Sequence, residues 1–282
     1  MSTNGVSALD IEITDHGRWV YYAICAVMGV TAFTIMGLSF LKPREDRIFF
    51  YITAAINFTA CIAYFTMGTE LGWAAIDVEF PRPRGSEVYG VTREVFYARY
   101  VDWAITTPLL LMDLLLTAGM PWPTVLWVIF LDELMIVTGL IGALVRSAYK
   151  FGFFVAGCVA MFIIFYELAV TARAEAKTLG PDVHRCFMSC GVLTLFVWLL
   201  YPIAWGVAEG GNVITPDSEA AFYGVLDVIA KPVFSAALIF GHWNVSPSRL
   251  GLAIHYGKPV NSDAQAELKN HMGRGQTTGA DA

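Results

Sequence analysis

A long apolar stretch of the chain, residues 99–113, carries three charged side chains: Arg99, Asp102 and Asp113. If this stretch is a helix, the two carboxylates lie on one face, about three turns or ~16 Å apart. An ionisable side chain at the depth of a lipid bilayer costs at least ~2.5–3.5 kcal/mol, so it rarely occurs there without a partner or a task. The spacing therefore favours acid–base chemistry along a line through a membrane.

A second apolar segment near the end of the chain holds Asp227 and, four residues later, Lys231. This spacing places both side chains on one helix face. A buried lysine is expected to lose its proton unless it has a counter-ion or is converted chemically, and such a lysine suits a Schiff base with an aldehyde cofactor. If that Schiff base is protonated, Asp102 and Asp227 supply two negative charges around it and Arg99 offsets part of the excess. We expect the two segments to meet.

The composition indicates an integral membrane protein. Of the 282 residues, 56% are hydrophobic and only 15% are charged, and the mean hydropathy is +0.57, whereas about a quarter of the residues of a soluble domain are charged. The net charge of −6 argues against nucleic acid as a partner. The five cysteines contain no CxxC motif, so we interpret them as buried thiols and expect no metal site.

Seven apolar stretches are each long enough to cross ~30 Å of hydrocarbon. They cover residues 19–41, 48–69, 95–117, 122–145, 151–172, 186–208 and 220–243. The fold class that follows is an all-α membrane protein, a bundle of seven transmembrane helices. The connection 71–94 contains the turn cluster from Pro81 to Gly85, which predicts a short β-hairpin between the second and third helices.

Orientation follows from Lys and Arg in short loops. The loops alone give a tie, and the basic residues near the C-terminus tip the count towards a cytoplasmic C-terminus. The predicted organisation is an extracellular N-terminal segment (1–18), a seven-helix domain (19–243) and a cytoplasmic tail (244–282) that is expected to be partly disordered.

The segment from Arg99 to Asp113 resembles the third helix of microbial rhodopsins, and the segment from Asp227 to Lys231 resembles their retinal-binding seventh helix. The similarity runs from about residue 19 to 243 and is to fungal members related to bacteriorhodopsin. It implies a retinal pocket in the core of the bundle, with all-trans retinal bound covalently to Lys231. In this family Asp, Thr and Asp at positions 102, 106 (Thr106) and 113 are the pattern of outward proton pumps.

The resemblance also implies roles for individual residues. Asp102 and Asp227 would be counter-ions, Asp102 would accept the Schiff-base proton, and Asp113 would restore it from the cytoplasmic side. Thr53 matches the threonine beside that donor. The alternative is that Asp113 merely forms a hydrogen bond with Thr53 and holds two helices together.

On the extracellular side the resemblance implies that Arg99 acts as a gate and that Glu209 and Glu219 form a proton-release pair. Glu219 has the expected spacing to Asp227, but Glu209 is one residue off the family pattern, and a solvated loop acid is the alternative. For Arg99, which lies three residues before Asp102, the alternative is a purely structural ion pair that holds the third helix to a neighbour.

The remaining candidate residues form a retinal pocket by resemblance. Trp198, Tyr201 and Trp205 share one helix face. Asp132 is expected to pair with Thr107, and Tyr64 to lie near the counter-ion. The full predicted set is Trp103, Thr107, Met135, Gly139, Phe154, Trp198, Tyr201, Pro202, Trp205, Tyr64 and Asp132.

Two positions depart from the family pattern. Phe154 replaces a tryptophan of bacteriorhodopsin, whereas rhodopsins with a carotenoid antenna have glycine there, so no antenna is expected. Pro232, directly after Lys231, removes a backbone donor and predicts a distorted seventh helix.

The leading function is therefore a light-driven outward proton pump, not an enzyme. It would work in the lipid bilayer of the plasma membrane with protons as its cargo, and by resemblance as a homo-oligomer, a trimer in many relatives. The main alternative is a retinal photosensor with a proton-transfer photocycle that signals through a partner; Asp113 argues against it, because sensors tend to lack a carboxyl donor there. A ligand-activated receptor lacks its motifs (DRY, NPxxY), and an enzyme using Lys231 on a soluble substrate lacks a water-exposed site.

Overall fold

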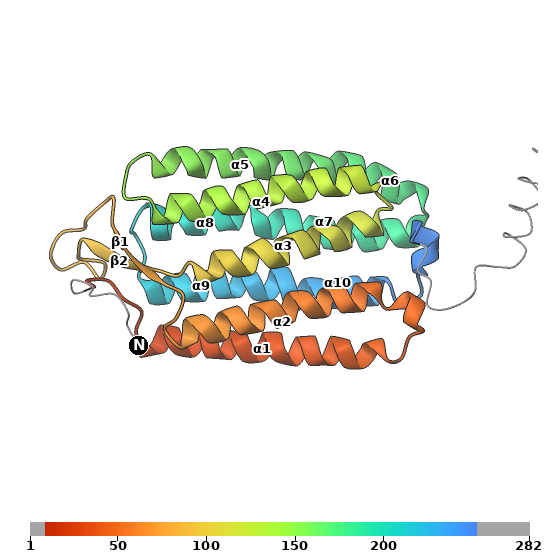
Figure 1. Ribbon diagram of the computed structural model, residues 1–282, viewed down its shortest axis with the longest axis horizontal. Helices are drawn as coiled ribbons and strands as arrows, with labels where there is room; N and C mark the ends of the chain where they lie inside the picture. Colours follow the sequence, from red (N-terminus) through yellow and green to blue (C-terminus); the bar gives the residue numbers. More distant parts are fainter. Residues whose placement is uncertain (1–8, 253–282) are drawn as a thin grey trace, which may run out of the picture. The chain divides into compact units, whose positions relative to one another are not determined.

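The computed structural model describes residues 9–252, and within this range seven helical spans are long and apolar enough to cross a membrane. The prediction of an all-α, seven-helix membrane protein is confirmed (Figure 1). The first eight residues of the predicted N-terminal segment, and the predicted tail from residue 253 onwards, lie outside the described residues.

The first four spans are single helices: α1 (Asp15–Ser39), α2 (Ile48–Gly68), α3 (Ala98–Thr117) and α4 (Trp122–Leu144). The fifth consists of α5 (Lys150–Tyr166), η2 (Glu167–Ala172) and α6 (Arg173–Thr178). The sixth consists of α7 (Pro181–Trp198), α8 (Leu200–Trp205) and η3 (Gly206–Gly210). The seventh consists of α9 (Pro216–Val228), η4 (Ile229–Val233) and α10 (Phe234–Gly241). Short 3-10 turns, η1 (Arg44–Asp46) and η5 (Pro247–Leu250), lie in the first connection and after the last span.

The sixth and seventh spans begin four or more residues before the predicted starts, because their N-terminal signals lie in polar sequence. Pro181 and Pro216 each occupy the first helical turn, where the missing N–H of proline costs nothing. The Thr215 side chain accepts a hydrogen bond from the Ser218 N–H and caps α9. Apolar composition alone does not register these caps.

The predicted hairpin is present. β1 (Ala74–Asp77) pairs antiparallel with β2 (Thr92–Val95), with Ala74 opposite Val95 and Asp77 opposite Thr92. Ile11 adds a parallel bridge to Arg93, so the N-terminal segment lies against the hairpin. We call this end of the bundle the hairpin end and the opposite end, which carries η5, the tail end (Figure 1).

Three π-helical turns occur in the last three spans: η2 and η4 lie within the fifth and seventh spans, and η3 ends the sixth. A π turn accommodates one residue more than an α turn and often occurs at functional sites. Pro232 lies within η4, and the predicted distortion of the seventh helix therefore takes the form of a π turn around Lys231.

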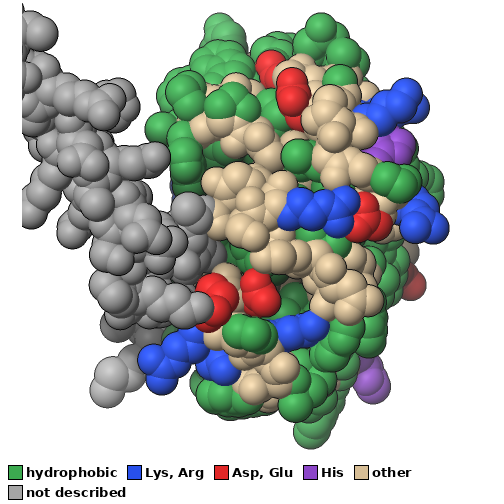
Figure 2. All heavy atoms as spheres, turned by 90° about the vertical axis from the view of Figure 1, so that its right-hand side faces the viewer, with side chains coloured by type: hydrophobic (Ala, Val, Ile, Leu, Met, Phe, Trp, Pro, Cys, Tyr) green, Lys and Arg blue, Asp and Glu red, His purple; other side chains and the backbone are tan. Residues whose placement is uncertain are grey.

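The tail half of the bundle has a continuous apolar core, to which α3 contributes Leu110, Leu111, Leu114 and Leu115. Large apolar side chains such as Phe33 and Phe162 are exposed on the outer helix faces, as expected for contact with lipid. Seen end-on, the tail end gathers charged side chains, with hydrophobic side chains around its rim (Figure 2). Arg249 and Asp182 form a 2.6 Å ion pair on the tail side.

Candidate functional site

Lys231 lies between two carboxylates in the core of the bundle. Its Nζ is 3.1 Å from Asp102 Oδ2 and 2.8 Å from Asp227 Oδ1, and none of the three side chains is more than 3% exposed. Asp102 comes from α3, while Asp227 and Lys231 come from α9 and η4. The expected meeting of the two charged segments is therefore observed as a three-membered cluster with one positive and two negative charges.

The two carboxylates differ in their hydrogen bonding. Asp227 accepts hydrogen bonds from Tyr64 Oη (2.6 Å), Tyr201 Oη (2.6 Å) and Trp103 Nε1 (3.3 Å). Apart from the Lys231 ammonium, no residue in the range 9–252 donates a hydrogen bond to the Asp102 carboxylate. Buried oxygens without donors are costly to leave charged. Asp227 is therefore held as an anion by three donors, whereas Asp102 depends on the lysine charge alone.

Two threonines next to this cluster differ in their bonding. Thr107 Oγ1 donates to Asp132 Oδ2 at 2.7 Å, which joins α3 to α4 in the predicted pair. Thr106 Oγ1 donates to the backbone carbonyl of Asp102 at 2.9 Å and not to its carboxylate. Thr106 therefore lies one helical turn from Asp102 but donates no hydrogen bond to the Asp102 carboxylate.

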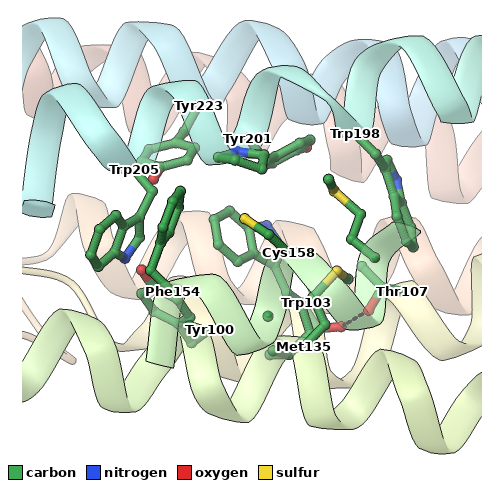
Figure 3. A pocket seen from close by; sticks show the side chains of 15 residues that line it. Tyr100, Trp103, Thr107, Met135, Phe154, Cys158, Trp198, Tyr201, Trp205 and Tyr223 are labelled. Carbon is green, nitrogen blue, oxygen red and sulfur yellow. Dashed lines mark hydrogen bonds between the residues drawn. The ribbon is translucent and has the colours of Figure 1, made fainter. Parts of the chain in front are cut away.

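A cavity of about 100 Å³ lies beside the lysine cluster (Figure 3). Trp198 and Thr107 lie at one end, and Trp205 and Phe154 lie at the other. The lining includes all predicted pocket residues except Tyr64 and Asp132: Trp103, Thr107, Met135, Gly139, Phe154, Trp198, Tyr201, Pro202 and Trp205. The sequence reading missed six further lining residues: Tyr100, Ile136, Gly157, Cys158, Met161 and Tyr223.

The shape and chemistry of the cavity fit an extended conjugated aldehyde. Phe154 stacks on Trp205 with ring centroids 4.6 Å apart, and a Cβ on Gly139 would come within 3.4 Å of the Tyr100 ring. Lys231 is not among the lining residues, but Trp103 and Tyr201 both line the cavity and bond to its partner Asp227. An apolar slot walled by rings thus adjoins a buried amine.

Towards the hairpin end, buried charges form a second cluster. Arg99 Nη1 is 2.6 Å from Glu219 Oε1 and 3.5 Å from Glu209 Oε1, and Arg93 Nη2 is 2.7 Å from Glu219 Oε2. All four side chains are at most 2% exposed. Among the described residues Arg99 has no ion pair with Asp102. Its ion pairs with Glu219 and Glu209 join α3 to α9 and η3, so the alternative of a structural role for Arg99 stays open.

Glu209 belongs to this cluster and not to a solvated loop. Its side chain accepts hydrogen bonds from Tyr223 Oη (3.1 Å) and Tyr100 Oη (3.3 Å). It lies in η3, and the extra residue of this π turn explains why its spacing is one residue off the expected pattern. The alternative of a solvated acid is wrong.

Arg93 and Lys150 are members of this cluster that the sequence reading missed, since both counted only as loop charges. Lys150 Nζ donates to the Glu209 carbonyl at 3.1 Å and is 1% exposed. Arg93 reaches Glu219 because β2 and the Ile11 bridge hold it over the bundle. No local pattern in the sequence signals either contact.

Asp113 differs from the acids of the hairpin-end cluster, because its buried carboxylate has no hydrogen-bond partner among the described residues. It is fully buried, and neither carboxylate oxygen has a hydrogen-bond partner within residues 9–252. Thr53 Oγ1 donates to the Phe49 carbonyl at 2.6 Å instead, so the alternative in which Asp113 bonds to Thr53 is wrong. Asp113 is thus a solitary acid flanked along α3 by core leucines.

These features define a class: a seven-helix membrane protein whose core holds a lysine between two carboxylates beside an aromatic slot. The chain belongs to the bacteriorhodopsin-like protein family, whose sequence model matches residues 14–245.

Named relatives agree with this assignment. The opsin-like protein carO of Fusarium fujikuroi is 63% identical over 245 residues, which cover 87% of this chain and 80% of carO. The solved light-driven proton pump of Leptosphaeria maculans is 35% identical with a TM-score of 0.79, covering 85% of this chain and all of that chain (100%). The light-driven proton pump of Coccomyxa subellipsoidea is 34% identical with a TM-score of 0.77, covering 82% of this chain and 99% of that chain.

Proposed function

We propose that the protein is a light-driven outward proton pump that carries all-trans retinal on Lys231. Lys231 would hold the retinal covalently, and the bound cofactor would supply light absorption and a light-driven change of geometry beside the Lys231 nitrogen. Trp103, Tyr201 and the other lining residues hold the chain of the cofactor and exclude water from it. The similarity to the solved light-driven proton pumps of Leptosphaeria and Coccomyxa supports the same function here.

The observation that carries the proposal is the difference between the two carboxylates beside Lys231. Three donors stabilise the negative charge of Asp227, so it has little tendency to take up a proton. Asp102 lies 3.1 Å from the same nitrogen and has no other hydrogen-bond donor in the described part of the chain. We propose that Asp102 is the acceptor and Asp227 the permanent counter-ion.

In this proposal the direction of transport follows from the groups that lie on the two sides of Lys231. On the hairpin side, Arg99, Glu209 and Glu219 offer a connected set of charged groups to which a proton on Asp102 can be passed. On the tail side, Asp113 has no cation beside it among residues 9–252, and an unpaired carboxylate at that depth would cost several kcal/mol. We propose that Asp113 holds a proton at rest and returns it to the lysine side.

The proposed topology places the hairpin end outside the cell and the tail end in the cytoplasm, in the plasma membrane. The predicted segments 1–18, 19–243 and 244–282 keep their extracellular, membrane and cytoplasmic assignments in this proposal. The homo-oligomer, a trimer by resemblance, remains part of it.

Light-induced pH change in a suspension of cells expressing the protein tests the function. We expect the medium to acidify in the light and the acidification to disappear with a protonophore. Lys231→Ala cells are the matched control and should give no signal. A pigment that completes its photocycle without acidifying the medium would overturn the pump and favour the photosensor.

A further inference from the structure

His242, the residue directly after α10, is a buried histidine at the edge of a cavity. It is 6% exposed, and its ring stacks on Phe49 with centroids 4.1 Å apart and planes 20° apart. It lines a cavity of about 180 Å³ at the tail end together with Lys42 and Asp46. The Lys42 ammonium donates to the Trp243 carbonyl and lies over the Trp243 ring. One side of the imidazole therefore meets a polar cavity and the rest is enclosed in protein.

The ring nitrogens connect this cavity to the helix of the proposed proton donor. His242 Nε2 is 3.2 Å from Thr117 Oγ1, and Thr117 Oγ1 is 2.6 Å from the backbone carbonyl of Asp113. On the other side of the ring, Nδ1 is 3.0 Å from the Leu238 carbonyl and 3.5 Å from Cys186 Sγ. Thr117 and Asp113 are one helical turn apart on α3, ~5.4 Å along the axis.

Counting protons in this chain of contacts shows that a neutral imidazole leaves it one proton short. The carbonyls of Leu238 and Asp113 can only accept, so they require Nδ1–H and the Thr117 O–H respectively. With the Thr117 proton used in that way, the contact to Nε2 requires a second N–H on the ring. Only the imidazolium satisfies all three contacts, while the neutral ring must choose between two tautomers.

We infer that His242 carries protons from the tail-end cavity to Asp113 during reprotonation. This inference rests on the proposed pump. Starting from the Nε2–H tautomer, a proton from cavity water binds Nδ1 and gives the imidazolium. The imidazolium then loses the Nε2 proton on the Thr117 side, and this proton passes through a bridging water to the Asp113 carboxylate. The ring is left as the neutral Nδ1–H tautomer, exchange between the tautomers restores the starting form, and Asp113 becomes a neutral acid.

The charges around the ring favour this cycle. Among the titratable groups, Cys186 on α7 contacts the ring and Lys42 and Asp46 line the cavity beside it. Asp113 lies one helical turn from Thr117 on α3, and the Thr117 hydroxyl contacts its backbone carbonyl. At rest, burial lowers the pKa of His242 from 6.5 to about 4, so the ring is neutral. When Asp113 gives up its proton, a negative charge appears one helical turn from Thr117, which contacts the ring, and this charge favours the imidazolium.

The kinetic test uses His242→Phe, which keeps a flat ring against Phe49 but cannot carry a proton. A pH-indicator dye follows release and uptake after a flash. We expect uptake to slow by about tenfold or more, since a positioned acid–base group contributes ~10²–10⁴-fold. Release should keep its rate, and added imidazole should restore uptake. His184→Phe, on α7 and outside these contacts, is the matched control and should behave as wild type.

A second measurement needs no illumination. The ¹⁵N signals of His242 in the dark should show a neutral ring at pH 7 with both tautomers populated. Thr117→Val removes the partner of Nε2 and should leave only the Nδ1–H form, bonded to Leu238. Identical spectra in wild type and Thr117→Val would contradict the proton count. This variant also serves if His242→Phe does not fold.

The outcomes separate the two levels of the proposal. If the wild type does not acidify the medium, the pump is wrong and so is the role of His242 in it. If the wild type pumps while His242→Phe takes up protons at the wild-type rate with the same pH dependence, only the role of His242 is wrong.

Discussion

On the hairpin side of Lys231, buried charged side chains contact one another, whereas on the tail side the Asp113 carboxylate has no hydrogen-bond partner among residues 9–252. Arg99 contacts Glu209 and Glu219, and tyrosine hydroxyls fill the remaining positions of Glu209. Asp113 lies in a region where α3 presents leucines to its neighbours. A charge can therefore be accommodated on the hairpin side without rearrangement, while on the tail side it requires the helices to admit water. In the proposed pump, the path by which protons leave (the exit) is already formed on the hairpin side. The path by which protons enter (the entrance) must open on the tail side.

The largest expected effect comes from the group at the boundary of the two halves. Lys231→Ala should fold but give no visible pigment when all-trans retinal is added, because the buried amine is lost. Absorption spectra of the purified protein before and after addition provide the measurement. A pigment retained in the variant would contradict the attachment of retinal to Lys231. It would also contradict the division of the proton path into two halves at that residue.

The second largest effect is expected for Asp102→Asn, which removes the proposed proton acceptor beside Lys231. Transport should stop, and the absorption maximum should move to the red because a negative charge beside the bound cofactor is lost. Asp227→Asn is the informative comparison, since it also disturbs three hydrogen bonds and should destabilise the protein more. Undiminished transport with unchanged colour in Asp102→Asn would contradict the acceptor role.

Asp113→Asn tests the entrance. The colour and the first deprotonation at Lys231 should change little, while reprotonation should slow by roughly 10²-fold and become dependent on the pH of the medium. Azide, a small diffusible acid, should restore the rate. Flash spectroscopy across a pH series provides the data. Decay at the wild-type rate, independent of pH, would count against the donor and in favour of the photosensor.

Arg93→Gln probes the hairpin cluster. Loss of the 2.7 Å pair leaves Glu219 with Arg99 alone, and breaking one partner of a buried ion pair typically costs ~3–5 kcal/mol. We expect a lower thermal midpoint and altered timing of proton release, with uptake unchanged. Arg84→Gln, in the exposed loop between the two strands, is the control. Slower uptake in Arg93→Gln would break the separation of the two halves.

The smallest expected effect concerns the N-terminal segment, which lies against the hairpin and bonds to Glu94. Burial and the nearby carboxylates of Glu70, Glu12 and Glu219 raise the pKa of Glu94 from 4.5 to about 7, although the Ile13 N–H, 2.9 Å away, opposes this. A raised carboxyl pKa contributes stability below pH 4.5 that is lost as the pH rises through 7.

The N-terminal segment should therefore be held more weakly at pH 8 than at pH 5, by roughly 1–3 kcal/mol. Hydrogen exchange of the Ile13 amide measures this, after correction for the intrinsic pH dependence. Glu94→Gln should show no such change; a Glu94→Gln protein with the wild-type pH dependence would assign the effect to another group.

The sequence predicted what depends on helical periodicity and apolar length. The seven spans and the meeting of Lys231 with Asp102 follow from these patterns, and the hairpin follows from the turn cluster between Pro81 and Gly85. It did not predict Arg93 over Glu219, because that contact depends on how the N-terminal segment and β2 fold back over the bundle. It also did not predict the position of His242, since a single histidine after an apolar run looks the same whether it faces solvent or Thr117.

The π turn at Gly206–Gly210 has a practical consequence for chimeric proteins. A residue added to an α-helix rotates everything beyond it by ~100°, whereas a π turn absorbs the added residue locally. In this chain the extra residue is accommodated in the π turn that follows Trp205. The helical register that places the pocket residues therefore differs from the register that places Glu209. A graft that joins the sixth span to that of a relative should therefore place its junction before Gly206 and transfer the whole turn, or Glu209 will face lipid.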